Sequence, residues 1–229
     1  MRIFLSFFLS IVTVIFNITN AQAGVVIGGT RLVYPEGKKE INITVENKEN
    51  FPYLIKTFLE KGSIESSAGY FMITPPLFRL DAQQKSVLRI FNASSAMPAD
   101  RESLFYFNVT SIPAATDEDA KQNTLQIAVR NRMKLFYRPK ALADDTPENV
   151  TTKLTWQITG GKLKVINPTD YYMNFSTVKV NNSLVKDALL LAPFSSNEYA
   201  LPNGVSSGTV IWKIINDQGG IGPEHKTTL

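Results

Sequence analysis

The chain has 229 residues, 44% of them hydrophobic, and its 24 basic and 20 acidic side chains give a formal charge of +4. These values are typical of one or two folded domains and exclude a disordered chain. The absence of cysteine and the single histidine, His225, exclude disulfide scaffolds, zinc fingers, thiolate nucleophiles and the Ser/His/Asp relay.

The charges form no long basic run of the kind that binds nucleic acid. No Gly-rich phosphate loop follows a predicted strand, and the only histidine lies near the C-terminus. We therefore expect no cofactor, no metal site, no nucleic-acid partner and no enzymatic activity.

The first 23 residues have the pattern of an export signal. Arg2 gives a positive start, and the apolar stretch 3–16 is too short to span a bilayer comfortably. Ala21, Gln22 and Ala23 fit the small-x-small rule of signal peptidase, so we predict cleavage after Ala23. The alternative is a membrane-anchored N-terminal helix, which requires a longer apolar run. No later segment is apolar enough to serve as a membrane anchor.

The region 24–139 is predicted to be an all-β domain. Apolar and polar side chains alternate along 41–46 and 125–130, which is the period of a half-buried strand. Runs rich in aromatic and β-branched residues predict further strands at 53–59, 87–91, 104–110 and 134–137. No helical stripe competes with this interpretation.

A second all-β block follows. The stretch 140–149 has little apolar periodicity and is predicted to be the interdomain linker. Strands are then predicted at 154–158, 163–165, 171–180, 189–191 and 210–215. This pattern predicts two immunoglobulin-like β-sandwich domains, at 24–139 and 150–229.

The middle of the chain carries the segment M-P-A-D-R-E-S-L-F-Y-F-N-V-T-S-I-P at 97–113, which resembles the signature of the periplasmic pilus-assembly (fimbrial) chaperones. Further similar segments are G-T-R from Gly29, I-T-P-P-L-F-R-L from Ile73, M-K-L-F-Y-R-P from Met133 and I-N-P-T from Ile166. The short connection 114–123 resembles the subfamily with a short F1–G1 loop, which serves rod-like pili.

The resemblance implies two immunoglobulin-like domains at an angle, with a cleft between them. It also implies a periplasmic chaperone that folds and caps pilus subunits by donor-strand complementation and delivers them to an outer-membrane usher, without nucleotide. Such a subunit lacks its last strand, and the exposed edges that result aggregate unless they are covered.

Donor-strand complementation requires a strand with an apolar face. The resemblance assigns the groove-filling side chains to Leu125, Ile127 and Val129, which share one face of a strand. Burying each of them is worth roughly 1.5–3 kcal/mol. The alternative is that these three side chains face the chain's own core, which is the default for an alternating strand.

The resemblance also assigns two cations, Arg31 and Lys134, to the C-terminal carboxylate of the subunit. A planar guanidinium fork and a compact ammonium both bind carboxylates well. The alternative is that both are solvated surface cations. Lys134 is an odd number of residues from Val129, so strict alternation puts it on the opposite face, and we expect a bulge or strong twist near Asn131 to reconcile the two.

By the same resemblance, an interdomain charge network comprises Arg89, Glu102 and Asp217, and it holds the cleft at a fixed angle. The alternative is three unrelated surface charges, since exposed ion pairs contribute little stability.

Two other functions stay open on the sequence alone. One is an exported immunoglobulin-like pilin or adhesin subunit, and the other is a generic two-domain binding module. The pilus system, the preferred subunits, the usher-contact surface and self-association of free molecules are also left open.

Overall fold

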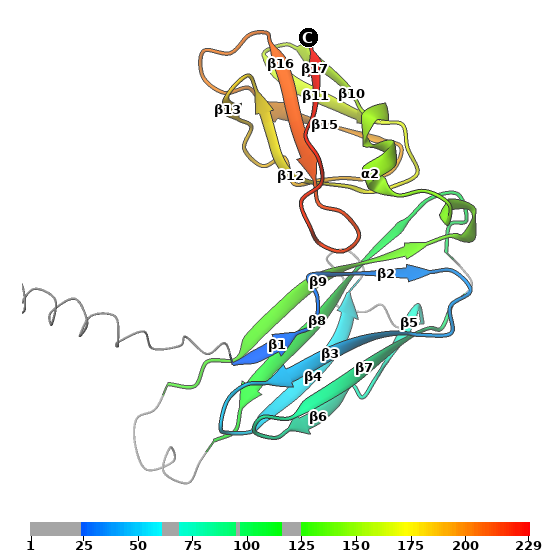
Figure 1. The fold of residues 1–229 in the computed structure, drawn as a ribbon, viewed down its shortest axis with the longest axis vertical. Helices are drawn as coiled ribbons and strands as arrows, with labels where there is room; N and C mark the ends of the chain where they lie inside the picture. Colours follow the sequence, from blue (N-terminus) through cyan, green and yellow to red (C-terminus); the bar gives the residue numbers. More distant parts are fainter. Residues whose placement is uncertain (1–23, 61–68, 95–96, 116–124) are drawn as a thin grey trace, which may run out of the picture.

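The computed structural model describes residues 24–60, 69–94, 97–115 and 125–229 (Figure 1). Figure 1 shows two β-sandwiches, one at each end of the long axis, which confirms the expected all-β, two-domain fold. The export signal with its cleavage after Ala23 lies outside the described residues, as does most of the connection 114–123.

Two sheets form the first domain. Its strands are β1 (Val25–Ile27), β2 (Arg31–Pro35), β3 (Ile41–Asn47), β4 (Tyr53–Glu60), β5 (Phe71–Thr74), β6 (Leu77–Leu80), β7 (Lys85–Asn92), β8 (Ser103–Pro113) and β9 (Val129–Arg138). One sheet has the order β1-β3-β7-β5 and the other β2-β9-β8-β4-β6. The core between the two sheets is built from alternate side chains, such as Val45 of β3, Ile90 of β7 and Phe107 of β8.

Strand β9 has neighbours on both sides along only half of its length. Its antiparallel pairing with β8 runs from Ser111↔Val129 to Ser103↔Tyr137, whereas its parallel pairing with β2 begins at Arg31↔Lys134. The chain before Arg31 leaves this sheet and joins the other one as β1. The edge of β9 at residues 129–133 is therefore open on the β2 side, among the residues that the structure describes.

Where the chain passes from one sheet to the other, the backbone of Gly28 packs tightly against Thr44 of β3. The Gly28 N–H donates to the Thr44 carbonyl at 2.9 Å, and a Cβ at this position would lie 2.2 Å from Thr44 Oγ1. A larger residue would therefore displace the Thr44 hydroxyl, which favours glycine where the chain passes from β1 towards β2.

The second domain is a smaller sandwich. Its strands are β10 (Thr155–Thr159), β11 (Lys162–Asn167), β12 (Met173–Val180), β13 (Ser183–Leu184), β14 (Leu190–Leu191), β15 (Ser195–Ala200), β16 (Thr209–Ile214) and β17 (His225–Thr228). One sheet has the order β10-β11-β15, and the other has the order β13-β12-β16-β17 with β14 paired to β12. Trp156 and Trp212 pack against each other in its core.

The expected linker at 140–149 is more structured than its composition indicates. It contains a 3-10 turn (Lys140–Leu142) and enters the short helix α2 (Pro147–Val150), which a second 3-10 turn (Thr151–Lys153) follows. Thr146 caps α2, because its side chain accepts from Asn149 N–H. Leu142 and Val150 both belong to the core of the second domain, so that domain begins packing within the stretch that we assigned to the linker.

Replacing Tyr171 by phenylalanine is expected to lower the free energy of unfolding by about 1–2 kcal/mol, because a buried carbonyl loses its donor. The Tyr171 hydroxyl donates to the Leu142 carbonyl at 2.6 Å, and burial raises the pKa of Tyr171 to about 12. A raised pKa means that the contribution is complete below the unfolded value of 10 and is lost as pH rises towards 12. Urea unfolding of both proteins at neutral and alkaline pH measures this. An equal difference at both pH values would contradict the assignment.

Candidate functional site

Arg31 and Lys134 lie side by side between the two domains. Their strands, β2 and β9, place them in direct register. Arg31 Nη1 donates to the Ile215 carbonyl at 2.8 Å, and Lys134 Nζ donates to Asn174 Oδ1 at 2.8 Å. Both acceptors belong to the second domain, so the pair lies where the two domains meet.

The two cations line a pocket of about 370 Å³. Its lining residues are Thr30, Arg31, Arg132, Met133, Lys134, Ile215 and Gly219. Arg31 Nε is buried and has no hydrogen-bond partner in the described part of the chain. Among the described residues, no carboxylate lies within 4.0 Å of the charged nitrogen atoms of Arg31 or Lys134.

The electrostatics of this pocket favour an anion. Burial lowers the pKa of Lys134, and the neighbouring charge of Arg31 lowers it further. Burial also lowers the pKa of Arg31, although Asp217 and Glu102 oppose that effect. Two partly desolvated cations side by side are unfavourable, and a carboxylate between them would relieve both the repulsion and the unsatisfied donor.

The three aliphatic side chains assigned to the subunit groove face solvent. The exposed fractions are 86% for Leu125, 67% for Ile127 and 53% for Val129. The alternative that they pack in the chain's own core is therefore wrong for this structure. The expected half-buried strand at 125–129 is also wrong, because β9 begins only at Val129. The last β8 residue that pairs with β9 is Ser111, and no strand of the described residues pairs with the segment before Val129.

No bulge occurs near Asn131, in contrast to our expectation. The pairing of β8 with β9 is continuous through Val109↔Asn131, and side chains alternate strictly along β9. Met133 points into the first core, whereas Lys134 points out of the sandwich into the pocket. The two expected functions therefore use opposite faces of one strand, and no irregularity is needed to reconcile them.

A buried charge network joins the domains, but its cation differs from the expected one. Arg138, at the end of β9, donates to Glu102 at 2.8 and 2.9 Å and to Asp217 at 2.6 and 2.8 Å. Arg89 lies on β7, is 58% exposed in its side chain, and has Glu40 as its ion-pair partner at 4.0 Å. Placing Arg89 in the network was therefore wrong, and sequence reasoning missed Arg138.

The network fixes one domain against the other. Glu102 also accepts from Tyr172 N–H at 2.9 Å, and its own N–H donates to the Asp170 carbonyl at 2.9 Å. Burial raises the pKa of Glu102, and Arg138 opposes that effect. Burial alone would lower the pKa of Arg138, but the hydrogen bonds and charges of Asp217 and Glu102 raise it. The two carboxylates therefore stabilise the charged form of Arg138.

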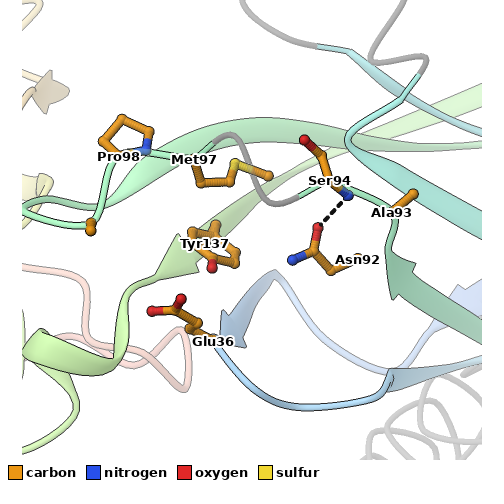
Figure 2. A pocket seen from close by; sticks show the side chains of 8 residues that line it. Glu36, Asn92, Ala93, Ser94, Met97, Pro98 and Tyr137 are labelled. Atoms are coloured by element: carbon orange, nitrogen blue, oxygen red, sulfur yellow. Dashed lines mark hydrogen bonds between the residues drawn. The ribbon is translucent and has the colours of Figure 1, made fainter.

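A second pocket, of about 520 Å³, lies near the start of the linker, where Glu36 accepts from Lys140 N–H at 2.8 Å. It is lined by Glu36, Asn92, Ala93, Ser94, Met97, Pro98, Ala99 and Tyr137. Figure 2 shows Glu36 and Tyr137 on one side and Asn92, whose side chain accepts from Ser94 N–H at 3.1 Å, on the other. Its lining residues include no Lys, Arg or His. This pocket therefore lacks the positive charge that would bind an anion, in contrast to the pocket of Arg31 and Lys134.

The described residues contain no cluster of side chains suited to a metal ion. Within the same ranges, no helix has the length and apolar character of a membrane span.

Comparison with known proteins identifies the family. The model described as the PapD N-terminal domain of pili and flagellar-assembly chaperones matches residues 24–143, and that of the PapD C-terminal domain matches 149–226. Chaperone protein FocC of Escherichia coli is 37% identical over 215 residues, which is 93% of each chain.

Two solved structures are also similar. The Salmonella enterica SafA pilin in complex with the SafB chaperone matches at 33% identity and TM-score 0.81, over 92% of this chain and 99% of that one. The E. coli chaperone DraB matches at 38% identity and TM-score 0.80, over 90% of this chain and 98% of that one. This chain therefore belongs to the PapD family of pilus-assembly chaperones, whose members are not enzymes.

Proposed function

We propose that this chain binds pilus subunits in the periplasm by donor-strand complementation and delivers them to an outer-membrane usher. The observation that carries the proposal is the open edge of β9 at 129–133, which lies between an exposed apolar segment and the cations Arg31 and Lys134. An open edge supplies backbone hydrogen bonds, and alternating apolar side chains supply specificity.

The geometry of the edge supports one direction for the incoming strand. Strand β2 occupies the edge of β9 from Lys134 onward, so a subunit strand on the open edge ends beside Lys134 and Arg31. If the subunit's carboxylate binds these two cations, its last strand runs in the same direction as β9. The register of the complex is then set by the charges, and a one-residue slip would turn every apolar side chain away from the groove.

The apolar face of the donor segment supplies the second half of the interaction. Leu125, Ile127 and Val129 share the parity of Met133, so they continue the inward face of β9 beyond the end of the chaperone's own core. All three side chains are more than half exposed there. A subunit that lacks its last strand has an apolar groove, which can accept this row of aliphatic side chains.

Three finer statements belong to the same proposal. The length of the connection 114–123 supports the subfamily with a short F1–G1 loop. The small-x-small pattern supports cleavage of the export signal after Ala23. SafB, a 33% identical relative, is in complex with a pilin, which supports a pilin-type subunit as the partner.

Replacing Ile127 by aspartate is expected to abolish subunit capture without changing the stability of the free chain. Ile127 is 67% exposed, so the free chain loses little. The complex loses the burial of an aliphatic side chain, worth roughly 1.5–3 kcal/mol, and must desolvate a carboxylate as well. Affinity purification of the tagged chain from the host periplasm, followed by native mass spectrometry, measures the bound subunit.

The matched control is Leu184→Asp, which changes a leucine of β13 that is 57% exposed in the second domain. It is expected to capture subunits as the unmodified chain does. Equal capture by both variants would exclude a donor strand at 125–129.

A further inference from the structure

The outward face of the five-stranded sheet carries more positive charge than the Arg31 and Lys134 pair alone. The pairing of β4, β8 and β9 arranges its side chains in three cross-strand rows. The rows are Lys56–Thr110–Arg130, Phe58–Asn108–Arg132 and Glu60–Tyr106–Lys134–Arg31. Five cations and one carboxylate occupy these rows, so the face is strongly cationic.

Arg130 and Arg132 share that single carboxylate, Glu60. Arg132 Nε donates to Glu60 Oε2 at 2.8 Å, while Arg130 Nη1 lies 3.8 Å from Glu60 Oε1. The side chain of Glu60 is only 10% exposed. Among the described residues, Glu60 is the one carboxylate within 4.0 Å of either guanidinium group, so the described part of this surface next to the open edge of β9 has a net positive charge.

Aromatic rings support both guanidinium groups. The guanidinium of Arg132 lies over the Tyr106 ring at 3.5 Å, and that of Arg130 lies over the Phe58 ring at 5.1 Å. These contacts reduce the conformational entropy that either side chain loses when it binds a ligand. Arg132 also lines the pocket that contains Arg31 and Lys134. The two arginines are therefore continuous with the carboxylate site and are held in place before a subunit arrives.

We propose that Arg130 and Arg132 select subunits whose last strand carries acidic side chains at the second- and fourth-last residues. The inference rests on the proposed function. Lys134, Arg132 and Arg130 follow one another in steps of two residues on one face of β9. A subunit strand that runs beside β9 has the same period, so alternate side chains upstream of its terminus lie next to Arg132 and Arg130 in turn.

Synthetic peptides that are long enough to cover the open edge at 129–133 test this proposal. One peptide ends in a free carboxylate and has Glu as its second- and fourth-last residues. A second has Gln at both places, and a third is the Glu peptide with a C-terminal amide. Binding to the mature chain is measured by calorimetry at low and high salt. The Glu peptide is expected to bind about tenfold or more tightly than the Gln peptide at low salt, because charged hydrogen bonds are lost in the latter.

The double variant Arg130→Gln, Arg132→Gln is expected to bind the Glu and Gln peptides equally. Because this variant leaves Glu60 buried without a cation, Arg130→Gln alone is measured in parallel. It preserves the 2.8 Å pair of Arg132 with Glu60, and it is expected to lose part of the preference. An unchanged preference in both folded variants would overturn the proposal.

Two further readouts separate this inference from the function on which it rests. If the amide peptide binds the unmodified chain as well as the free-carboxylate peptide, the Arg31 and Lys134 anchor fails, whatever the Glu preference is. If the unmodified chain shows no Glu preference but binds vesicles of anionic phospholipid, and the double variant does not, the cationic face binds a membrane surface and the proposal is overturned.

Discussion

Lys134→Ala is expected to abolish subunit capture while the chaperone stays folded. In the proposed complex, Lys134 and Arg31 share the subunit's carboxylate in a partly buried pocket. Removing one partner of a desolvated charge pair costs about 3–5 kcal/mol, or a weakening of roughly a hundredfold to a few thousandfold. The fold tolerates the change because burial and the charge of Arg31 already disfavour a charged Lys134 in the free chain.

Native mass spectrometry of the tagged chain from the periplasm of its own host measures this effect. The unmodified chain is expected to carry one small secreted subunit, and the variant none. Lys162→Ala is the matched control, since Lys162 lies in the second domain in an exposed pair with Glu198. Normal capture by a folded Lys134→Ala variant would contradict the anchor, and an uncomplexed unmodified chain under piliating conditions would favour a generic binding module.

Local sequence pattern was sufficient for most strands and for the two domains. Alternation along 41–46 identified β3, and the strands predicted at 154–158 and 163–165 correspond to the hairpin of β10 and β11. Leu142 was missed because a single apolar residue in a polar stretch has no period, although it packs in the second core. The start of β9 was misplaced because alternation predicts which face a side chain takes, not whether a neighbouring strand exists to pair with it.

Long-range pairing explains the misassigned cation. Arg89 and Arg138 both lie on strands with alternating patterns, and the local sequence does not say which one meets Glu102 across the sheet. A usable signal was present: Lys134, Phe136 and Arg138 are two residues apart, so a strand that places Lys134 between the domains places Arg138 on the same side. The rows that bring Glu60 near Arg132 depend on the register of three strands, which no short motif encodes.

Arg138→Met is expected to lower the free energy of unfolding by about 3–5 kcal/mol, because Glu102 then stays buried with no cation. The matched control is Arg89→Met, which removes an arginine from an exposed pair at 4.0 Å and is expected to change stability by less than about 1 kcal/mol. Urea unfolding of both variants measures the difference. Equal stability of the two variants would show that the interdomain network contributes nothing beyond a surface ion pair.

The pH dependence of Arg138→Met provides a second criterion. Burial raises the pKa of Glu102, and without Arg138 only the hydrogen bond from Tyr172 N–H and the charge of Arg31 oppose that effect. A carboxyl with a raised pKa in the folded state disfavours folding at neutral pH, where it must be charged, and ceases to do so once it is protonated. The deficit of Arg138→Met relative to Arg89→Met is therefore expected to shrink as the pH falls through the raised pKa of Glu102. A deficit that is constant with pH would place the loss in packing around the arginine side chain and not in the uncompensated charge.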